Sequence, residues 1–235
     1  MPPSREKSVV LVSGGLDSAV TLKHTVDAGA AVLGLFFDYG QRALRKERTA
    51  ARTMCKDLGA DFRVVGLHWL REIAPAAVVK KGAPLPTVYS GDLSQSSCMR
   101  QSARAVWVPN RNACMVSIGA SFAEALGCNA VVAGFNREEG ASFPDNGREF
   151  VLAMNKTLQI STGGKVALEC PLIDMDKTRI VKYGIEIEAR LDRVWSCYRG
   201  GAKFCWRCES CARLERALRR NKRLGWFKGV NKNAL

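Results

Sequence analysis

The stretch Ser8-Val9-Val10-Leu11-Val12-Ser13-Gly14-Gly15-Leu16-Asp17-Ser18 indicates the fold class. Residues 8–12 form a short apolar run, rich in β-branched side chains, that is typical of a strand buried in a parallel sheet. A glycine pair then turns the chain into a helix that Asp17 or Ser18 can cap and that ends near Gly29. The turn is therefore expected at the carboxyl end of a strand and the amino end of a helix, where backbone amides have no partners.

Strands and helices continue to alternate along the chain. Further strands are predicted at 31–37, 62–65, 130–134 and 166–168, and further helices at 42–58, 112–126, 149–158 and 177–183. This alternation predicts an α/β fold with a doubly wound parallel sheet, whose ligands bind at the carboxyl ends of the strands. Residues 74–107, which are rich in proline, glycine and serine, interrupt the pattern and are expected to form an irregular excursion from the sheet.

The glycine turn predicts a phosphate-binding loop. Its two glycines let the backbone approach phosphate oxygens, Ser13 and Ser18 add hydroxyl groups, and Asp17 can orient the loop or hold Mg²⁺. A Walker loop would end in Gly-Lys-Ser or Gly-Lys-Thr, and a dinucleotide-binding fingerprint would need a third glycine, so neither motif is present. A plain turn is the remaining structural alternative.

Placed after a buried strand, this loop resembles the pyrophosphate loop of the N-type ATP pyrophosphatases. The resemblance implies a Rossmann-like fold of the adenine nucleotide alpha hydrolase type, and cleavage of ATP between its α and β phosphates. The residues that it assigns to ATP binding are Val12, Ser13, Gly14, Gly15, Leu16, Asp17 and Ser18.

The nine cysteines fall into two patterns. Five lie singly and are interpreted as small buried hydrophobic residues: Cys55, Cys98, Cys114, Cys128 and Cys170. The others follow the spacing Cys197-x7-Cys205-x2-Cys208-x2-Cys211, which lets four thiolates bind one tetrahedral zinc ion. An iron–sulfur cluster and a redox-active cysteine pair are the alternatives that the spacing leaves open. Since four protein ligands leave no open position, the metal is expected to be structural.

The composition is that of a globular protein without a membrane segment. Hydrophobic residues make up 47% and charged residues 25% of the 235 residues, which argues against extended disorder. No apolar run approaches the roughly 18 to 20 residues of a membrane helix. The start Met1-Pro2-Pro3-Ser4-Arg5-Glu6-Lys7 lacks an apolar signal segment, so a cytoplasmic location is expected.

The formal net charge of +14 is concentrated near the carboxyl terminus. Residues 197–235 contain eleven Lys or Arg against two Glu, a net charge of +9. Such a segment attracts nucleic acid or acidic protein surfaces without specificity, and a solvated basic helix is the plain alternative. We therefore divide the chain into a nucleotide-binding domain at 1–190, which includes the excursion 74–107, and a basic zinc-binding segment at 191–235.

Further pieces along nearly the whole chain resemble the 7-cyano-7-deazaguanine synthase family, N-type pyrophosphatases of queuosine biosynthesis with a four-cysteine site. They are Asp38-Tyr39-Gly40-Gln41-Arg42, Arg111-Asn112, Pro144-Asp145, Asn155-Lys156, Pro171-Leu172-Ile173, Lys177 and Trp195-Ser196-Cys197-Tyr198. The resemblance implies that ATP adenylates 7-carboxy-7-deazaguanine and that ammonia displaces AMP to give the amide. A second ATP then activates the amide, and loss of AMP leaves the nitrile. The resemblance also implies an ATP-dependent C–N ligase that uses Mg²⁺ and Zn²⁺ and is often a homodimer.

The resemblance also suggests roles for single residues. The candidate catalytic residues are Asp17, Ser18, Lys156 and Lys177, and Arg111 joins the ATP site. The candidate substrate-binding residues are Gln41, Arg42 and Asp145, of which Asp145 can accept the paired N–H donors of a guanine-like edge. Solvated surface charges are the alternative for Arg111, Lys156 and Lys177. The two histidines, His24 and His68, are interpreted as packing or surface residues.

Departures from the family pattern lie around the base site. Residues 142–147, Ser-Phe-Pro-Asp-Asn-Gly, stand where the family commonly has Gly-Tyr-Pro-Asp-Cys-Arg, Asn110 stands for a glycine and Ala43 for a histidine. These changes leave the acceptor open. A second hypothesis therefore passes the adenylated acid to a different amine, on a protein or a metabolite. A third makes the chain a nucleic-acid-binding zinc protein or transfer-RNA modifier that docks through its basic tail.

Overall fold

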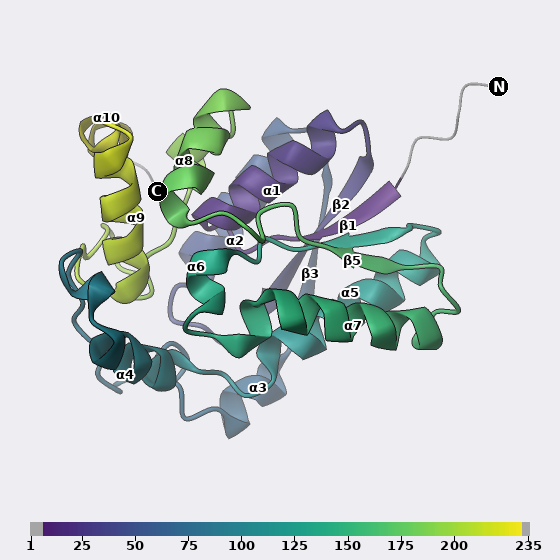
Figure 1. Cartoon of the computed structure of the whole chain (residues 1–235), viewed down its shortest axis with the longest axis horizontal. Coiled ribbons are helices and arrows are strands. Elements are labelled where there is room, and N and C mark those ends of the chain that lie inside the picture. The colour runs from purple at the N-terminus through teal and green to yellow at the C-terminus, as the bar shows by residue number, and fades with distance from the viewer. Residues whose placement is uncertain (1–6, 232–235) are drawn as a thin grey trace.

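A five-stranded, all-parallel sheet forms the centre of the computed structural model, which describes residues 7–231, and helices cover both of its faces (Figure 1). The strand order is β3-β2-β1-β4-β5. The chain therefore starts in the middle strand, adds strands toward one edge, and then crosses to add strands toward the other. The expected α/β fold with a doubly wound parallel sheet is confirmed.

The strands are short and the helices are of ordinary length. The strands are β1 (Lys7–Leu11), β2 (Ala31–Asp38), β3 (Asp61–Gly66), β4 (Ala130–Val132) and β5 (Ala167–Glu169). The helices are α1 (Leu16–Asp27), α2 (Leu44–Asp57), α3 (His68–Ile73), α4 (Ser96–Val106), α5 (Arg111–Ala125), α6 (Arg137–Gly140), α7 (Arg148–Ser161), α8 (Lys177–Glu186), α9 (Glu209–Arg220) and α10 (Leu224–Val230). Three 3₁₀ turns are η1 (Asp92–Ser94), η2 (Pro144–Asn146) and η3 (Leu191–Arg193).

The sheet separates two hydrophobic cores. Val9 and Val10 of β1 are both fully buried, and because successive side chains of a strand point to opposite faces, they belong to different cores. The core that contains Val10 packs against α1, α2, α8 and α9, and the core that contains Val9 packs against α3, α5 and α7. Two-sided burial explains why β1 is apolar at nearly every position rather than at every second one.

Two local expectations need correction. Gly15 is the N-cap of α1 and no side chain caps this helix, so neither Asp17 nor Ser18 has the predicted capping role. Residues 74–107 add no strand to the sheet, but they are not wholly irregular, since they include the eleven-residue helix α4. The serine-rich sequence obscured this helix, which is stabilised by burial of Met99, Ala103 and Val106.

The cysteine-rich segment is not a separate body. Leu214, Ala217 and Leu218 of α9 and Phe227 of α10 are buried in the same core as α1 and α8, and α9 lies beside α8 in Figure 1. The boundary expected near residue 190 therefore runs through a shared core.

No helix among residues 7–231 has the length and apolar character needed to span a bilayer. Residues 1–6 and 232–235, which include most of the start that was searched for a signal segment, lie outside the described residues.

Gly34 tests the packing of α2 on β2. A Cβ at this position would lie 2.5 Å from Cys55 Sγ, and both residues are buried. We expect Gly34→Ala to lower the free energy of unfolding by ~1–3 kcal/mol, measured by denaturant titration. Most of this loss should disappear in a Cys55→Ala background. The matched control is Gly225→Ala in α10, where a Cβ meets nothing within 4 Å; equal losses at both glycines would contradict this account.

Candidate active site

Two adjoining cavities open at the carboxyl ends of the strands. The larger one, of about 240 Å³, is lined by residues that directly follow β1 and β4, including the loop 13–18 and Gly134. The smaller one, of about 80 Å³, lies between the segments that follow β2 and residues 106–108 and 143–146. The residues that line both cavities are Tyr39, Gln41, Glu47, Arg111, Asn112, Glu139, Asn146 and Tyr198. The two hollows therefore form one continuous site.

The glycine loop is packed tightly enough to require its glycine. Gly14 has a φ of +81°, and a Cβ there would lie 2.4 Å from the carbonyl oxygen of Glu47 in α2. Within the loop, the Gly15 amide donates to Ser13 Oγ at 3.3 Å and Ser18 Oγ donates to the Gly15 carbonyl at 3.1 Å. These contacts hold the amino end of α1 open toward the larger cavity, as an anion site requires.

A buried lysine joins three elements of the larger cavity. Lys177, at the start of α8, donates to Asp17 Oδ2 in α1 and to Glu139 Oε1 in α6, both at 2.5 Å. Burial alone would lower the pKa of Lys177, but the two carboxylates raise it, so the side chain stays charged. Burial raises the pKa of Asp17 to about 6, against the opposing effect of Lys177.

A second ion network supports α6 from behind. Arg213 of α9 pairs with Glu138 at 2.7 Å and with Glu209 at 2.8 Å. Ser102 of α4 donates to the other oxygen of Glu209 at 2.6 Å. The cysteine-rich segment and the helix of the excursion thus help to position the wall that presents Glu139.

Glu47 of α2 faces both cavities. Its Oε2 atom accepts a hydrogen bond of 3.1 Å from Gln41 Nε2. The Gln41 amide is itself fixed, because it donates to the Phe37 carbonyl and accepts from the Tyr39 amide. Burial raises the pKa of Glu47 to about 7, with a smaller contribution from the Cys197 thiolate, against the opposing effects of Gln41 and Arg111.

Aromatic and charged groups surround the smaller cavity. The rings of Trp107 and Phe143 are nearly parallel, at 6° and with centroids 6.4 Å apart. Asp145 lines the same cavity, and burial raises the pKa of its carboxyl group. Arg111 donates to the Tyr39 hydroxyl at 3.2 Å and lies over the Tyr39 ring. The smaller cavity is therefore lined by two aromatic rings, a carboxylate and a guanidinium.

Asn110 explains one departure from the family pattern. Its φ of 53° lies in the left-handed region, which glycine favours and which asparagine tolerates better than most other residues. The replacement of a glycine therefore preserves the turn that begins α5 and places Arg111 in the site.

Most sequence-predicted site residues lie together. The larger cavity is lined by Val12, Ser13, Gly15, Leu16, Asp17, Ser18, Gln41, Arg111 and Lys177, and the smaller one adds Asp145. Gly14 of the same loop lines neither cavity and packs against the Glu47 carbonyl. Lys156 is exposed on α7 and lines neither cavity. Arg42 also lies outside both, because its guanidinium donates to the carbonyls of Lys80 and Ala83 and so anchors the excursion.

Several residues of the site were missed by the sequence analysis. They are Glu47, Trp107, Glu138, Glu139, Glu209 and Arg213. Glu139 follows the strand β4 within a polar loop, and this position is a signal that could have found it. No comparable signal marks Glu47, because it lies on a helix among many other charged residues.

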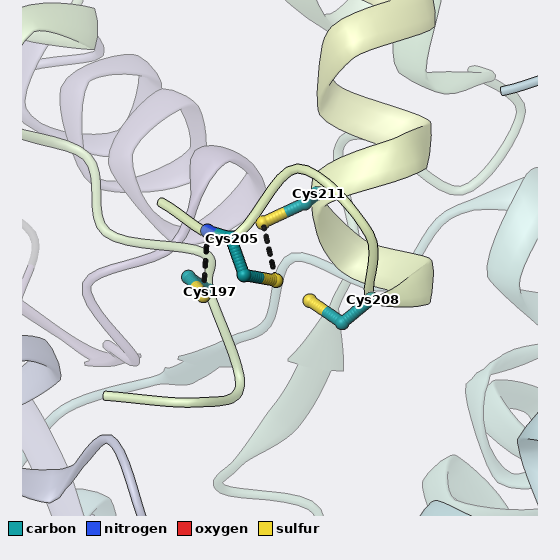
Figure 2. A group of neighbouring side chains, drawn as sticks. All are labelled: Cys197, Cys205, Cys208 and Cys211. Atoms are coloured by element: carbon teal, nitrogen blue, oxygen red, sulfur yellow. Dashed lines mark hydrogen bonds between the residues drawn. The ribbon is translucent and has the colours of Figure 1, made fainter. Parts of the chain in front are cut away.

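The four clustered cysteines converge on one point (Figure 2). All their Sγ atoms lie within 4.8 Å of one another, and the Cys205 and Cys211 sulfurs are 3.9 Å apart. Zn–S bonds of about 2.3 Å place tetrahedral thiolates about 3.8 Å apart, so zinc fits this set. The cysteine cluster also adjoins the glycine loop, since the backbone amide of Trp195, two residues before Cys197, donates to the Gly14 carbonyl at 2.8 Å.

Comparisons with known proteins agree over almost the whole chain. The family described as "Queuosine biosynthesis protein QueC" matches residues 7–222. A 7-cyano-7-deazaguanine synthase of Pelotomaculum thermopropionicum is 46% identical over 213 residues, which cover 91% of this chain and 96% of that protein. A protein of the same name from Methanosarcina mazei is 40% identical over 216 residues, covering 91% and 94%.

The cysteine cluster predicts one zinc ion per chain, measured by elemental analysis of the purified protein. Cys205→Ser should lose the zinc, and because the segment contacts Gly14, its affinity for an ATP analogue should fall at least about tenfold, or 1.4 kcal/mol. Cys98→Ser, at a half-buried cysteine outside the cluster, should keep both. Iron with visible absorption would contradict the zinc assignment.

The raised pKa of Glu47 predicts that this residue lowers the free energy of unfolding as the pH rises. Its pKa rises from 4.5 to about 7 on folding, so between these pH values the unfolded chain releases a proton that the folded chain retains. Stability conferred by the protonated group is therefore lost as pH rises from 4.5 to 7. We expect Glu47→Gln to be more stable than the wild type at pH 8 by on the order of 2 to 3 kcal/mol, but nearly equal at pH 4. Urea titrations at both pH values measure this, and a pH-independent difference would refute it. The exposed Glu72→Gln is the control.

Proposed function

Since this chain belongs to the QueC family of queuosine biosynthesis proteins, we propose that it is an ATP-dependent 7-cyano-7-deazaguanine synthase. The substrate is 7-carboxy-7-deazaguanine, which ATP adenylates. Ammonia displaces AMP to give the amide, and a second adenylation and loss of AMP give the nitrile. The names of the relatives and the continuous double cavity are the observations that support this proposal most directly.

ATP is proposed to occupy the larger cavity. The amino end of α1 and the loop 13–18 supply backbone amides and hydroxyl groups for its phosphates. Asp17 Oδ1 is buried and has no hydrogen-bond partner among the described residues, which suits a ligand of Mg²⁺ or of its water. Lys177 adds a fixed positive charge beside Asp17.

The deazaguanine is proposed to occupy the smaller cavity. Trp107 and Phe143 line this cavity with a pair of nearly parallel aromatic rings, against which a planar ring can pack. Asp145 is an acceptor for the paired N–H donors of a guanine-like edge. Although the loop 142–147 departs from the family sequence at several positions, it retains the carboxylate of Asp145 and an aromatic ring at Phe143.

The first step needs little acid–base chemistry, because a carboxylate is already nucleophilic. The chain must hold it in line with the α phosphate and stabilise the charge that develops on the leaving pyrophosphate. Arg111 lines both cavities and is positioned between acid and phosphate. The thiolates of the cysteine cluster would hold zinc, which stabilises the fold next to the loop and leaves no position for substrate.

Mass spectrometry of the products from carboxylate, ATP, Mg²⁺ and ammonium tests the proposal. We expect the nitrile, with AMP and pyrophosphate released at each activation. Asp17→Ala should reduce turnover at least about tenfold, because it removes a group at the phosphate loop. The control is Asp27→Ala, at a largely exposed carboxylate at the other end of the same helix.

Other products would favour the other hypotheses. AMP formed without amide or nitrile would contradict ammonia as the acceptor and favour transfer to a different amine. A requirement for RNA in turnover would favour docking of nucleic acid on the basic residues of α9 and its surroundings.

A further inference from the structure

We propose that Glu47 is the residue that binds ammonium and removes its proton, an assignment that rests on the function proposed above. Ammonia is almost entirely protonated at neutral pH, and the ammonium ion has no lone pair with which to attack an acyl adenylate. An enzyme that uses free ammonium therefore gains from a carboxylate beside the acyl carbon.

The position of Glu47 is the first argument. The acyl carbon must lie where the deazaguanine cavity meets the ATP cavity, because it is bonded on one side to the ring and on the other to the α phosphate through oxygen. Glu47 lines both cavities. A nucleophile held by its carboxylate is therefore at the junction where the new C–N bond forms.

Glu47 differs from Glu139 in lacking a direct ion pair, although the more distant Arg111 lowers the pKa of its carboxyl group. Glu139 is the other carboxylate that lines both cavities, but it forms a 2.5 Å ion pair with Lys177. Among the described residues, no Lys or Arg nitrogen is recorded within 4.0 Å of the Glu47 carboxylate. A small cation can therefore supply the missing partner.

The hydrogen bonds of Glu47 leave one oxygen for this ligand. Gln41 binds Oε2, and the backbone of residues 37–39 fixes the Gln41 amide. Oε1 accepts no hydrogen bond from the described residues. The carboxylate is thus oriented by one oxygen and available at the other, and its raised pKa suits a group that exchanges protons near neutral pH.

In the proposed step, Glu47 takes one proton from ammonium, and the nitrogen lone pair then attacks the acyl carbon. The bond from that carbon to the phosphate oxygen breaks, and AMP leaves with the electron pair. The nitrogen then releases a second proton to solvent, which gives the neutral amide. Glu47 loses its proton to water and returns to the carboxylate form, and the amide is the substrate of the second activation.

Glu47→Gln tests the assignment, with Glu72→Gln as the exposed control. Three rates are measured with the carboxylate and MgATP: exchange of labelled pyrophosphate into ATP without amine, amide formation from ammonium, and hydroxamate formation from hydroxylamine. Hydroxylamine is uncharged at neutral pH and needs no prior deprotonation. We expect exchange and hydroxamate formation within about threefold of the wild type, and a loss of at least about 100-fold in kcat/KM for ammonium.

Each other outcome overturns the assignment in a recognisable way. Unchanged use of ammonium would show that Glu47 does not handle the amine. Equal losses of exchange and hydroxamate would place Glu47 in adenylation instead. Absence of exchange in the wild type would refute the proposed function itself, and with it the role of Glu47.

Discussion

The ammonium group of Lys177, buried between two carboxylates, is the interaction that holds the site together. It ties the first turn of α8 to Asp17 beside the nucleotide loop and to Glu139 in α6. The adjacent Glu138 extends the network to Arg213 in α9. Because buried charges are costly unless every one is paired, these elements must all be in place for any of them to be stable. The site is therefore a property of the whole chain rather than of its motif.

The sequence predicted those features that are encoded locally. The run 8–18 gave the buried strand, the loop and the helix, and the spacing of the cysteines placed four sulfurs at one point. Glu139 was missed although its position after β4 marks it, and Glu47 was missed because it lies among many other charged residues of α2 and faces a cavity that distant segments form. Arg42 was assigned to substrate from a motif, and in the structure its guanidinium donates to the carbonyls of Lys80 and Ala83 and lines neither cavity. A motif identifies a residue, whereas only packing determines where the side chain points.

Two residues that depart from the family pattern have clear structural roles. Asn110 adopts a left-handed turn that glycine would adopt freely. Asn146 is buried, and its side-chain oxygen accepts a hydrogen bond from the backbone amide of Asn136. Both residues position their neighbours Arg111 and Asp145. Loop differences of this kind can persist if they preserve the position of the groups that face the ligand, and Phe143 beside Trp107 is consistent with that rule.

The backbone hydrogen bond from Trp195 to Gly14 links the glycine loop to a segment that lies far later in the sequence. During synthesis on a ribosome, β1, the loop and α1 emerge early, but the residues that close the cavity, including Tyr198 and Leu214, emerge much later. A nascent or truncated chain would therefore have the glycine loop but would lack the residues that line the opposite side of the cavity. The larger cavity is therefore complete only after residues 195–214 have been synthesised and have packed against the glycine loop.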